Sequence, residues 1–292
     1  MARMTTPSGL LVSTDWLATH LGDPSVRVFD CTVRIAPTPD SIRFPSGNPL
    51  YAAGHIPGAA FADLTAGLNR HDEQDNWFML PSPADFADAA GALGIGDGLT
   101  VVLYDQGQTM WAARLWWQLR LHSFDALVLD GGFARWQAEG RPVSQEAAAH
   151  APATLTPRLR PELLATTADV YAVTQEGGAC LINAVGREQH RGTSPQHAGR
   201  PGHIPASVNL PYDALLDPAT NAYLPPATLR ELFAAQGAHP GERVITYCGG
   251  AIAASSAALA LALAGVDDVA VYDGSLRQWA ADPALPLVVD AP

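Results

Sequence analysis

The stretch VITYCGGAIAAS, residues 244–255, joins a short run of β-branched and aromatic residues to a cysteine, two glycines and an alanine-rich segment. The residues before Cys248 predict a buried strand, and those from about Ala253 onward predict a helix. In open α/β sheets, ligands bind at the carboxyl ends of the strands, which is where Cys248 falls. We therefore interpret Cys248 as the centre of a functional site.

The loop after Cys248 is suited to an anionic sulfur. Gly249 and Gly250 allow the backbone to curl closely around the side chain. Successive N–H groups in such a loop form an anion-binding nest, and the following helix adds a positive partial charge at its N-terminus. Both features favour the thiolate, which is the nucleophilic form of cysteine, and they would equally stabilise a persulfide. Cys31 and Cys180 lack this context and are interpreted as small buried apolar residues.

The chain repeats this pattern of motifs. GHIPGAAF begins at Gly54 and GHIPASVN begins at Gly202, 202 − 54 = 148 residues later. Three further pairs are each 143 residues apart, namely Asp105 and Cys248, Asp130 and Asp273, and Trp136 and Trp279. Ordered matches at a nearly constant offset predict two tandem copies of one domain. Asp105 occupies in the first copy the position that Cys248 occupies in the second.

Each copy alternates short apolar strands with helices, which predicts the α/β class with a parallel sheet flanked by helices. The first copy is expected over 8–143 and the second over 158–292. Residues 144–157 show no apolar periodicity and are rich in Pro, Ala, Ser and Thr, so they are expected to form a linker.

The composition excludes several classes of function. The chain carries 29 acidic and 17 basic residues, a net charge of −12, so nucleic acid and anionic membranes are not expected partners. No apolar run is long enough to span a membrane, and no signal peptide is evident, so a cytoplasmic location is expected. The three cysteines form neither a CxxC pair nor a disulfide framework, so neither a metal nor a cofactor is expected.

Taken together, these motifs resemble the two-domain rhodanese family, the thiosulfate or 3-mercaptopyruvate sulfurtransferases. The resemblance extends from about Val12 to Val289 and rests on GHIPGA, LWW, DGGFARW, GHIPASVNLP, TYC and YDGSLRQWAADP. It implies two tandem rhodanese-like domains, each a parallel sheet with helices on both faces. It also implies that the first is degenerate and that Cys248 in the second carries sulfur as a persulfide. The implied donor is thiosulfate or 3-mercaptopyruvate, and the implied acceptor is cyanide or a thiol.

The resemblance also assigns the residues around Cys248. The persulfide-cradling loop maps to Gly249, Gly250, Ala251, Ile252 and Ala253, and the apolar walls map to Met110, Trp111 and Tyr212. The histidines of the two GHIP motifs are expected to be structural, with their rings bonded to backbone, and the repeated aspartates and tryptophans likewise; these residues are His55, His203, Asp130, Asp273, Trp136 and Trp279.

The chain departs from the family pattern around the substrate. Val185 stands where the family has the arginine that holds the substrate anion, so Arg191 and Arg200, and more weakly Arg187, are the candidates to replace it. Ala253 stands in place of a hydroxyl residue, and a lost charge-assisted hydrogen bond of this kind is worth about 1.5–3 kcal/mol.

Three smaller departures follow. Asn183 replaces an aspartate, Val33 replaces an aromatic residue and thins one wall, and Ala251 replaces a glycine and would resist a positive φ.

Two alternatives follow from these departures. A rhodanese-like sulfur-carrier or binding protein with little turnover is the second interpretation, motivated by Val185 and Ala253. A cysteine phosphatase also uses a strand, a cysteine, a loop and a helix, but it needs an arginine six residues after the cysteine, where this chain has Ala254. The phosphatase interpretation is therefore rejected.

Overall fold

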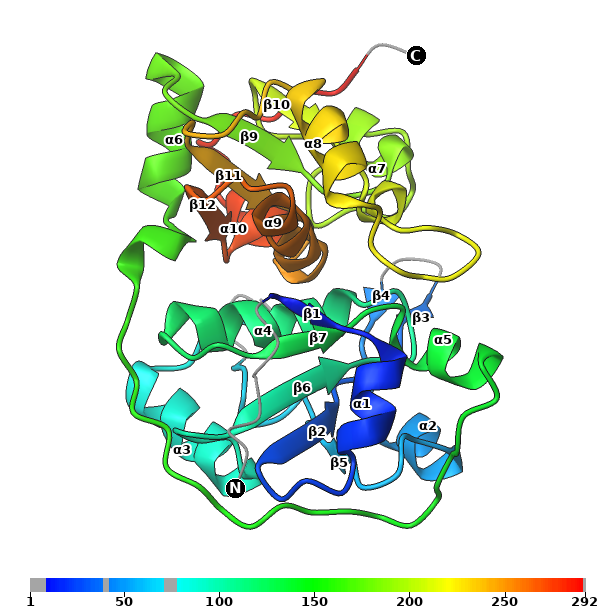
Figure 1. Ribbon diagram of the computed structural model, residues 1–292. Coiled ribbons are helices and arrows are strands. Elements are labelled where there is room, and N and C mark those ends of the chain that lie inside the picture. Colours follow the sequence, from blue (N-terminus) through cyan, green and yellow to red (C-terminus); the bar gives the residue numbers. More distant parts are fainter. Residues whose placement is uncertain (1–8, 39–41, 71–77, 291–292) are drawn as a thin grey trace.

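Two five-stranded parallel sheets, one in each half of the chain, form the framework of the molecule (Figure 1). The computed structural model describes residues 9–38, 42–70 and 78–290. The first sheet has the order β1 (Leu11–Val12), β7 (Leu127–Leu129), β6 (Thr100–Tyr104), β2 (Val26–Asp30) and β5 (Ala60–Phe61). The second has the order β10 (Ser207–Asn209), β9 (Cys180–Asn183), β11 (Val244–Tyr247), β12 (Val269–Tyr272) and β8 (Leu164–Ala165).

Register shows that the two sheets are copies. In the first, Asp30 pairs with Tyr104 at the ends of β2 and β6, and in the second, Asn183 pairs with Tyr247 at the ends of β9 and β11. The central strands β6 and β11 therefore deliver Asp105 and Cys248 to the same edge of their sheets. A short antiparallel pair, β3 (Ala36–Pro37) and β4 (Ile42–Arg43), is present only in the first half of the described chain.

Helices cover both faces of each sheet. In the first half, successive side chains of β6 enter opposite layers, so that Val101 and Leu103 pack on one side while Val102 and Tyr104 pack on the other. The helices of this half are α1 (Thr14–His20), α2 (Asn48–Ala53), α3 (Pro83–Leu93), α4 (Met110–Leu121) and α5 (Gly132–Ala138).

The second half has the same arrangement. Its helices are α6 (Thr167–Glu176), α7 (Arg187–Arg191), α8 (Pro226–Ala234), α9 (Ile252–Leu263) and α10 (Ser275–Ala281), with 3₁₀ turns η1 (Pro161–Leu163) and η2 (Tyr212–Leu215). The predicted α/β class and the two parallel sheets flanked by helices are confirmed. The helix expected near Ala253 begins one residue earlier, at Ile252, and Gly265 follows it with φ 81, as a helix stop requires.

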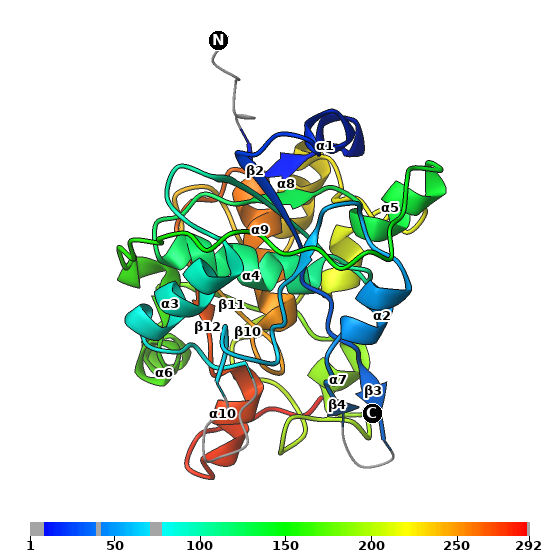
Figure 2. The ribbon, with the colours of Figure 1, turned by 90° about the horizontal axis from the view of Figure 1, so that it is seen from below.

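The two halves meet through α4 and α9, which cross each other at the centre of the molecule (Figure 2). Both helices are buried almost throughout, which explains why neither has a polar face. At one end of the interface the carboxylate of Asp130 accepts the backbone N–H of Tyr223 at 3.0 Å. At the other end the carboxylate of Asp273 accepts the N–H of Leu80 at 3.0 Å, so the repeated aspartates hold the halves together symmetrically.

The connection between the halves runs around the outside of the first half (Figure 1) and is hydrogen-bonded to it. His55 and Ser144 exchange both backbone hydrogen bonds, and the indole of Trp136 donates to the carbonyl of Pro142. The last described residues of the chain are hydrogen-bonded to the second half in the same way. His203 and Val288 exchange both backbone hydrogen bonds, and the indole of Trp279 donates to the carbonyl of Pro286. We call residues 141–160 and 282–290 the two straps.

No helix among the described residues is long and apolar enough to cross a membrane.

Candidate active site

Cys248 follows directly after the last residue of β11, and its residue is 4% exposed. Three residues separate it from α9. Neither Gly249 nor Gly250 has a positive φ; the residue that does is the one expected to resist it. The left-handed residue is Ala251, with φ 64, at the cap of α9. A non-glycine residue in this region stores strain, and such strain is concentrated at functional sites.

Ser275 holds both ends of this loop. Its hydroxyl accepts the N–H of Cys248 at 3.2 Å and the N–H of Ala251 at 3.1 Å, and it donates to the carbonyl of Tyr272 at 2.8 Å. The first turn of α10 adds two more bonds, from the N–H of Leu276 to the carbonyl of Cys248 and from that of Arg277 to the carbonyl of Gly249. The loop is therefore fixed by the segment that follows the neighbouring strand, β12.

The matching loop of the first half shows what such a loop binds. The carboxylate of Asp105 is fully buried and accepts four backbone N–H groups at 2.8–3.0 Å, those of Gly107, Thr109, Trp111 and Ala112. Burial is the largest influence on Asp105 and raises its pKa, as does the charge of Asp30, while the N–H groups of Ala112, Gly107 and Thr109 act to lower it. A strand end, a loop and a helix start in this fold thus form a cradle for one negatively charged group.

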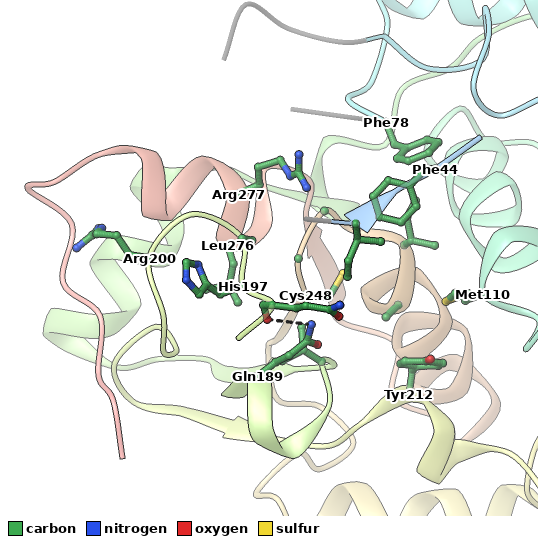
Figure 3. Close-up of a pocket in the computed structure, with 18 of the residues that line it drawn as sticks. Phe44, Phe78, Met110, Gln189, His197, Arg200, Tyr212, Cys248, Leu276 and Arg277 are labelled. Atoms are coloured by element: carbon green, nitrogen blue, oxygen red, sulfur yellow. Dashed lines mark hydrogen bonds between the residues drawn. The ribbon is translucent and has the colours of Figure 1, made fainter. Parts of the chain in front are cut away.

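Cys248 opens into a cavity of about 200 Å³ between the two halves (Figure 3). The first half contributes mainly apolar side chains to it, and the second half contributes the loop together with amides, an imidazole and two arginines. The lining residues are Ile42, Phe44, Phe78, Met110, Trp111, Val185, Gln189, Gln196, His197, Ala198, Arg200, Gly202, Tyr212, Cys248, Gly249, Gly250, Ile252, Ala253, Leu276 and Arg277. None of these described residues is acidic, although the chain carries a net charge of −12.

The structure brings most of the sequence-predicted residues to this cavity. Met110 and Trp111 at the start of α4 line it, as does Tyr212, whose hydroxyl donates to Gln108 of the first half at 2.9 Å. Burial is the main cause that raises the pKa of Tyr212, followed by the charges of Asp213 and Cys248. Val185 lines the cavity as an apolar residue where the family arginine was expected.

The two predicted replacement arginines are placed differently. Arg191 is exposed and is not among the residues that line the cavity. Arg200 does line it, but its guanidinium donates to the carbonyls of Ala280, Asp282 and Leu285, which attaches the strap 282–290 to the cavity loop. In Figure 3 its side chain extends away from Cys248. The more weakly favoured Arg187 lies outside the lining as well.

Several lining residues were not found from the sequence. Arg277 lies four residues after Asp273 in a motif that was treated only as structural. Gln189 lies in α7, and Gln196 and His197 lie in the irregular segment after it, where no motif of the sequence marks them. The aromatic residues Phe44 and Phe78 come from parts of the first half that carry no repeat match, so only tertiary contacts reveal them.

The expected structural role of the GHIP histidines is confirmed. Nδ1 of His55 is 2.8 Å from the carbonyl of Tyr51, and Nδ1 of His203 is 2.8 Å from the carbonyl of His190. His190 and His203 stack at 3.8 Å with only 12° between their planes, and the carboxylate of Asp290 lies nearby. Ligand lone pairs lie in the ring plane, so two nearly parallel rings do not converge on one tetrahedral ion, and this cluster is interpreted as a brace.

Comparison with known proteins agrees with this geometry. The rhodanese-like domain matches residues 13–139 and 191–282. The chain is 32% identical over 95% of its length to thiosulfate/3-mercaptopyruvate sulfurtransferase 2 of Arabidopsis thaliana, covering 86% of that protein. It is 31% identical over 94% of its length to 3-mercaptopyruvate sulfurtransferase of Escherichia coli K12, covering 96% of it. It is 33% identical over 92% of its length to bovine thiosulfate sulfurtransferase, covering 91%.

The crystal structure of the 3-mercaptopyruvate sulfotransferase SseA from Escherichia coli superposes with a TM-score of 0.75 at 28% identity, over 92% of this chain and 99% of that one. The chain therefore belongs to the rhodanese family of sulfurtransferases, in its tandem two-domain form.

Proposed function

We propose that Cys248 is the nucleophile of this sulfurtransferase and that it carries the transferred sulfur as a persulfide. The donor would be thiosulfate or 3-mercaptopyruvate, and the acceptor cyanide or a thiol. The observation that supports this most is the equivalence of the two loops. Where the first half places a carboxylate under four N–H groups, the second places a thiol that opens into a cavity.

The reaction has two steps and follows ping-pong kinetics. The Cys248 thiolate attacks the outer sulfur of thiosulfate, a new S–S bond forms, and sulfite leaves with the electron pair of the broken bond. The acceptor then attacks the outer sulfur of the persulfide and the Cys248 thiolate is regenerated. By analogy with Asp105, N–H groups among residues 249–254, other than that of Ala251, which is bonded to Ser275, hold the outer sulfur anion. The missing hydroxyl at Ala253 therefore weakens the cradle without removing it.

In this proposal the side chain of Arg277 binds the negatively charged sulfur donor. Its backbone is bonded to Gly249 within the active loop, and its side chain lines the cavity. Arg200 would contribute at the cavity rim, while Arg191 is not among the lining residues and is not proposed. Replacing Arg277 by Met should raise the KM for thiosulfate about tenfold with a smaller change in kcat, because one charge-assisted contact to the donor is lost. An unchanged KM would remove Arg277 from donor binding.

The second candidate function is a sulfur carrier with little turnover, favoured by the absence of an arginine at Val185 and of a hydroxyl at Ala253. Turnover separates the two, since a carrier forms the persulfide but releases it slowly to every acceptor. Val185→Arg combined with Ala253→Thr should then raise the rate. We keep the cytoplasm as the proposed location, which fractionation of the source cells would test.

The deciding experiment is intact-protein mass spectrometry after incubation with thiosulfate and, separately, with 3-mercaptopyruvate. The proposal expects a gain of one sulfur atom that cyanide removes, in the wild type and not in Cys248→Ser. Cys180→Ser and Cys31→Ser serve as matched controls and should gain sulfur as the wild type does. No gain from either donor would contradict the proposal.

A further inference from the structure

A second cavity lies at the edge of the first sheet opposite to Asp105. It has a volume of about 360 Å³ and is formed where β1, β6 and β7 begin and where α4 ends. Its lining residues are Gly9, Leu10, Leu99, Thr100, Trp116, Arg120, Phe124, Asp125, Ala126 and Leu127. None of these residues lines the cavity beside Cys248, so the two cavities are separate.

The walls of the second cavity are mostly apolar. Trp116, Phe124 and Leu127 are buried, while Leu10 and Leu99 are half-buried. Concave apolar surface that still faces solvent is favourable to cover, and cavities of a few hundred Å³ with such a lining commonly bind small molecules. The second cavity is therefore suited to an apolar body about the size of one aromatic ring.

Arg120 is the basic residue of this lining. Its guanidinium lies over the ring of Trp116, 5.4 Å from the centroid. Within the part of the chain that the structure describes, this guanidinium forms no hydrogen bond and no ion pair. Stacking on the face of a ring leaves the N–H groups at the guanidinium edge available to a carboxylate, which they can bind in a bidentate manner.

The charges near Arg120 do not neutralise it. Burial, followed by the charge of Arg160, lowers the pKa of Arg120. Three acidic residues raise this pKa, but none of them forms an ion pair with its guanidinium; they are Asp125, Asp267 and Glu162. Glu162 is paired with Arg160 instead, at 2.9 Å, and Asp125 is exposed, so that water screens its charge. A half-buried cation without a partner favours an anionic ligand.

The second cavity also lies beside the junction of the two halves. Trp116 and Arg120 line a narrow crevice whose other wall includes Leu163 and Val266 of the second half. Their helix, α4, lies between the first sheet and the second half (Figure 1), and it begins with Met110 in the cavity beside Cys248. A ligand held by Arg120 would therefore contact the helix that joins the halves.

We propose that the second cavity binds a small organic anion, a monocarboxylate with an apolar body such as a phenyl ring. The carboxylate accepts two N–H groups of Arg120, and the ring packs on Leu99 and Leu127. Residues 1–8, MARMTTPS, contain no acidic side chain, so they supply no counter-charge to Arg120. The binding is independent of the chemistry proposed for Cys248.

The test is isothermal titration calorimetry of the full chain with 3-phenylpropionate, with its neutral amide 3-phenylpropanamide, and with acetate. The amide keeps the apolar body and lacks the charge, whereas acetate keeps the charge and lacks the body. The wild type should bind 3-phenylpropionate at least about tenfold more tightly than either comparison compound, because one charge-assisted contact or one buried ring has an effect of this size.

Variants of Arg120 locate the charge. Arg120→Met keeps the apolar stem and should lower the affinity for 3-phenylpropionate at least about tenfold, with no change for the amide. Arg120→Lys keeps the charge without the planar fork and should give an intermediate affinity. Arg158→Met removes an exposed cation of the strap 141–160, and Arg277→Met removes a cation beside Cys248. Both of these controls should bind as the wild type does.

Leu99→Gln tests the apolar wall. It should weaken the binding of 3-phenylpropionate at least about threefold and leave that of acetate unchanged, because part of the apolar contact is lost. Leu159→Gln is the matched control, since Leu159 is exposed and lies outside the lining, and it should bind as the wild type does. Circular dichroism and the urea midpoint check that each variant is folded.

Three outcomes would contradict the proposal. Equal affinities for the acid and its amide, or an unchanged affinity in Arg120→Met, would remove Arg120 from anion binding. A loss in Arg277→Met instead would place the anion in the cavity beside Cys248. Tighter binding of phenylalanine than of 3-phenylpropionate would make Asp125 an anchor for an ammonium group, and the assignment to a simple monocarboxylate would fail. Sulfur loading of Cys248 is measured separately and does not depend on these results.

Discussion

The loops that follow β6 and β11 start from the same strand end and lead into matching helices, yet one is closed and the other is open. In the first half, Asp105 fills the cradle with its own carboxylate and accepts four N–H groups. In the second half, Cys248 places a thiol at that position and leaves the space beside it to the cavity. A cradle of N–H groups requires an anion, and the two halves differ in whether that anion is permanent or exchangeable.

Cys248→Asp is expected to have the largest effect, because it places a carboxylate at the strand end where the first half has Asp105. Sulfur uptake should fall to background, at least about a thousandfold below wild type, since a carboxylate cannot form a persulfide. In urea titrations the free energy of unfolding of this variant should nevertheless exceed that of Cys248→Ser by about 1 kcal/mol, because the new carboxylate accepts the loop N–H groups. A lower stability than that of Cys248→Ser would show that the two loops are not equivalent cradles.

Asp105→Ala tests the closed loop and should produce the largest loss of stability. It leaves four buried N–H groups without their acceptor, so the free energy of unfolding should fall by about 3–5 kcal/mol in urea titrations. Asp105→Asn, which retains one acceptor oxygen, should recover part of it. Asp125→Ala changes an exposed carboxylate of the same half and should stay within about 0.5 kcal/mol of wild type. A loss of similar size in Asp125→Ala would mean that the cradle is not the cause.

The histidine braces give a smaller, pH-dependent contrast. The ring stacked on the GHIP histidine is Tyr51 in the first half and His190 in the second. Burial, followed by the charge of His203, lowers the pKa of His190 from 6.5 to about 4, with Arg191 lowering it further and Asp290 opposing them. Below 6.5 the unfolded chain takes up the proton more readily than the folded one, so stability falls as the pH drops from 6.5 towards 4.

His190→Tyr gives the second half the pairing found in the first. The difference in urea midpoint between wild type and this variant should be constant above pH 6.5 and should shift in favour of the variant between 6.5 and 4. Carboxylates that titrate in the same range are common to both proteins and cancel in the difference. A difference that does not change with pH would remove His190 from the acid response.

Ala251→Gly should have the smallest effect. Ala251 and Thr109 cap α9 and α4 with φ values of 64 and 65, which glycine adopts without strain. The free energy of unfolding should rise by about 0.5–1 kcal/mol, the relief of strain being partly offset by the greater entropy of the unfolded chain. Thr109→Gly should gain less, because it also loses a contact of its hydroxyl with Asn221. A loss of stability in Ala251→Gly would mean that the loop is not strained at this residue.

Much of the fold could be predicted because the same motifs occur in both halves of the sequence. Strands at 26–30, 100–104, 180–183 and 244–247 are short and apolar, as strands buried on both faces must be, and the repeat aligns them. The residues that follow Cys248 were predicted to belong to the site because they come directly after a strand end and before a helix, which the local sequence indicates. The domain limits at 143 and 158 remain a prediction, although the strap 141–160 is bonded to the first half along its length.

The remainder of the site depends on contacts that no local pattern reveals. Phe44 and Phe78 line the same cavity as Cys248 only because α4 crosses α9 and because Arg114 pairs with Asp273, 159 residues later in the chain. The guanidinium of Arg200 is turned outward by carbonyls of the strap 282–290, which lie more than 80 residues further on. The positive φ of Ala251 could not be predicted from its residue type, because alanine disfavours this region and the cap of α9 imposes it.

The straps have a consequence for anyone who wishes to express the halves separately. Each half is closed by the segment that comes after its last helix, through paired bonds at His55 and Ser144 in one case and at His203 and Val288 in the other. If the chain were divided at the predicted boundary near residue 143, most of the strap 141–160, which closes the first half, would remain attached to the second half. A separately folded first half therefore has to extend to about residue 160, and a peptide fused after residue 290 would begin beside the loop that lines the active cavity.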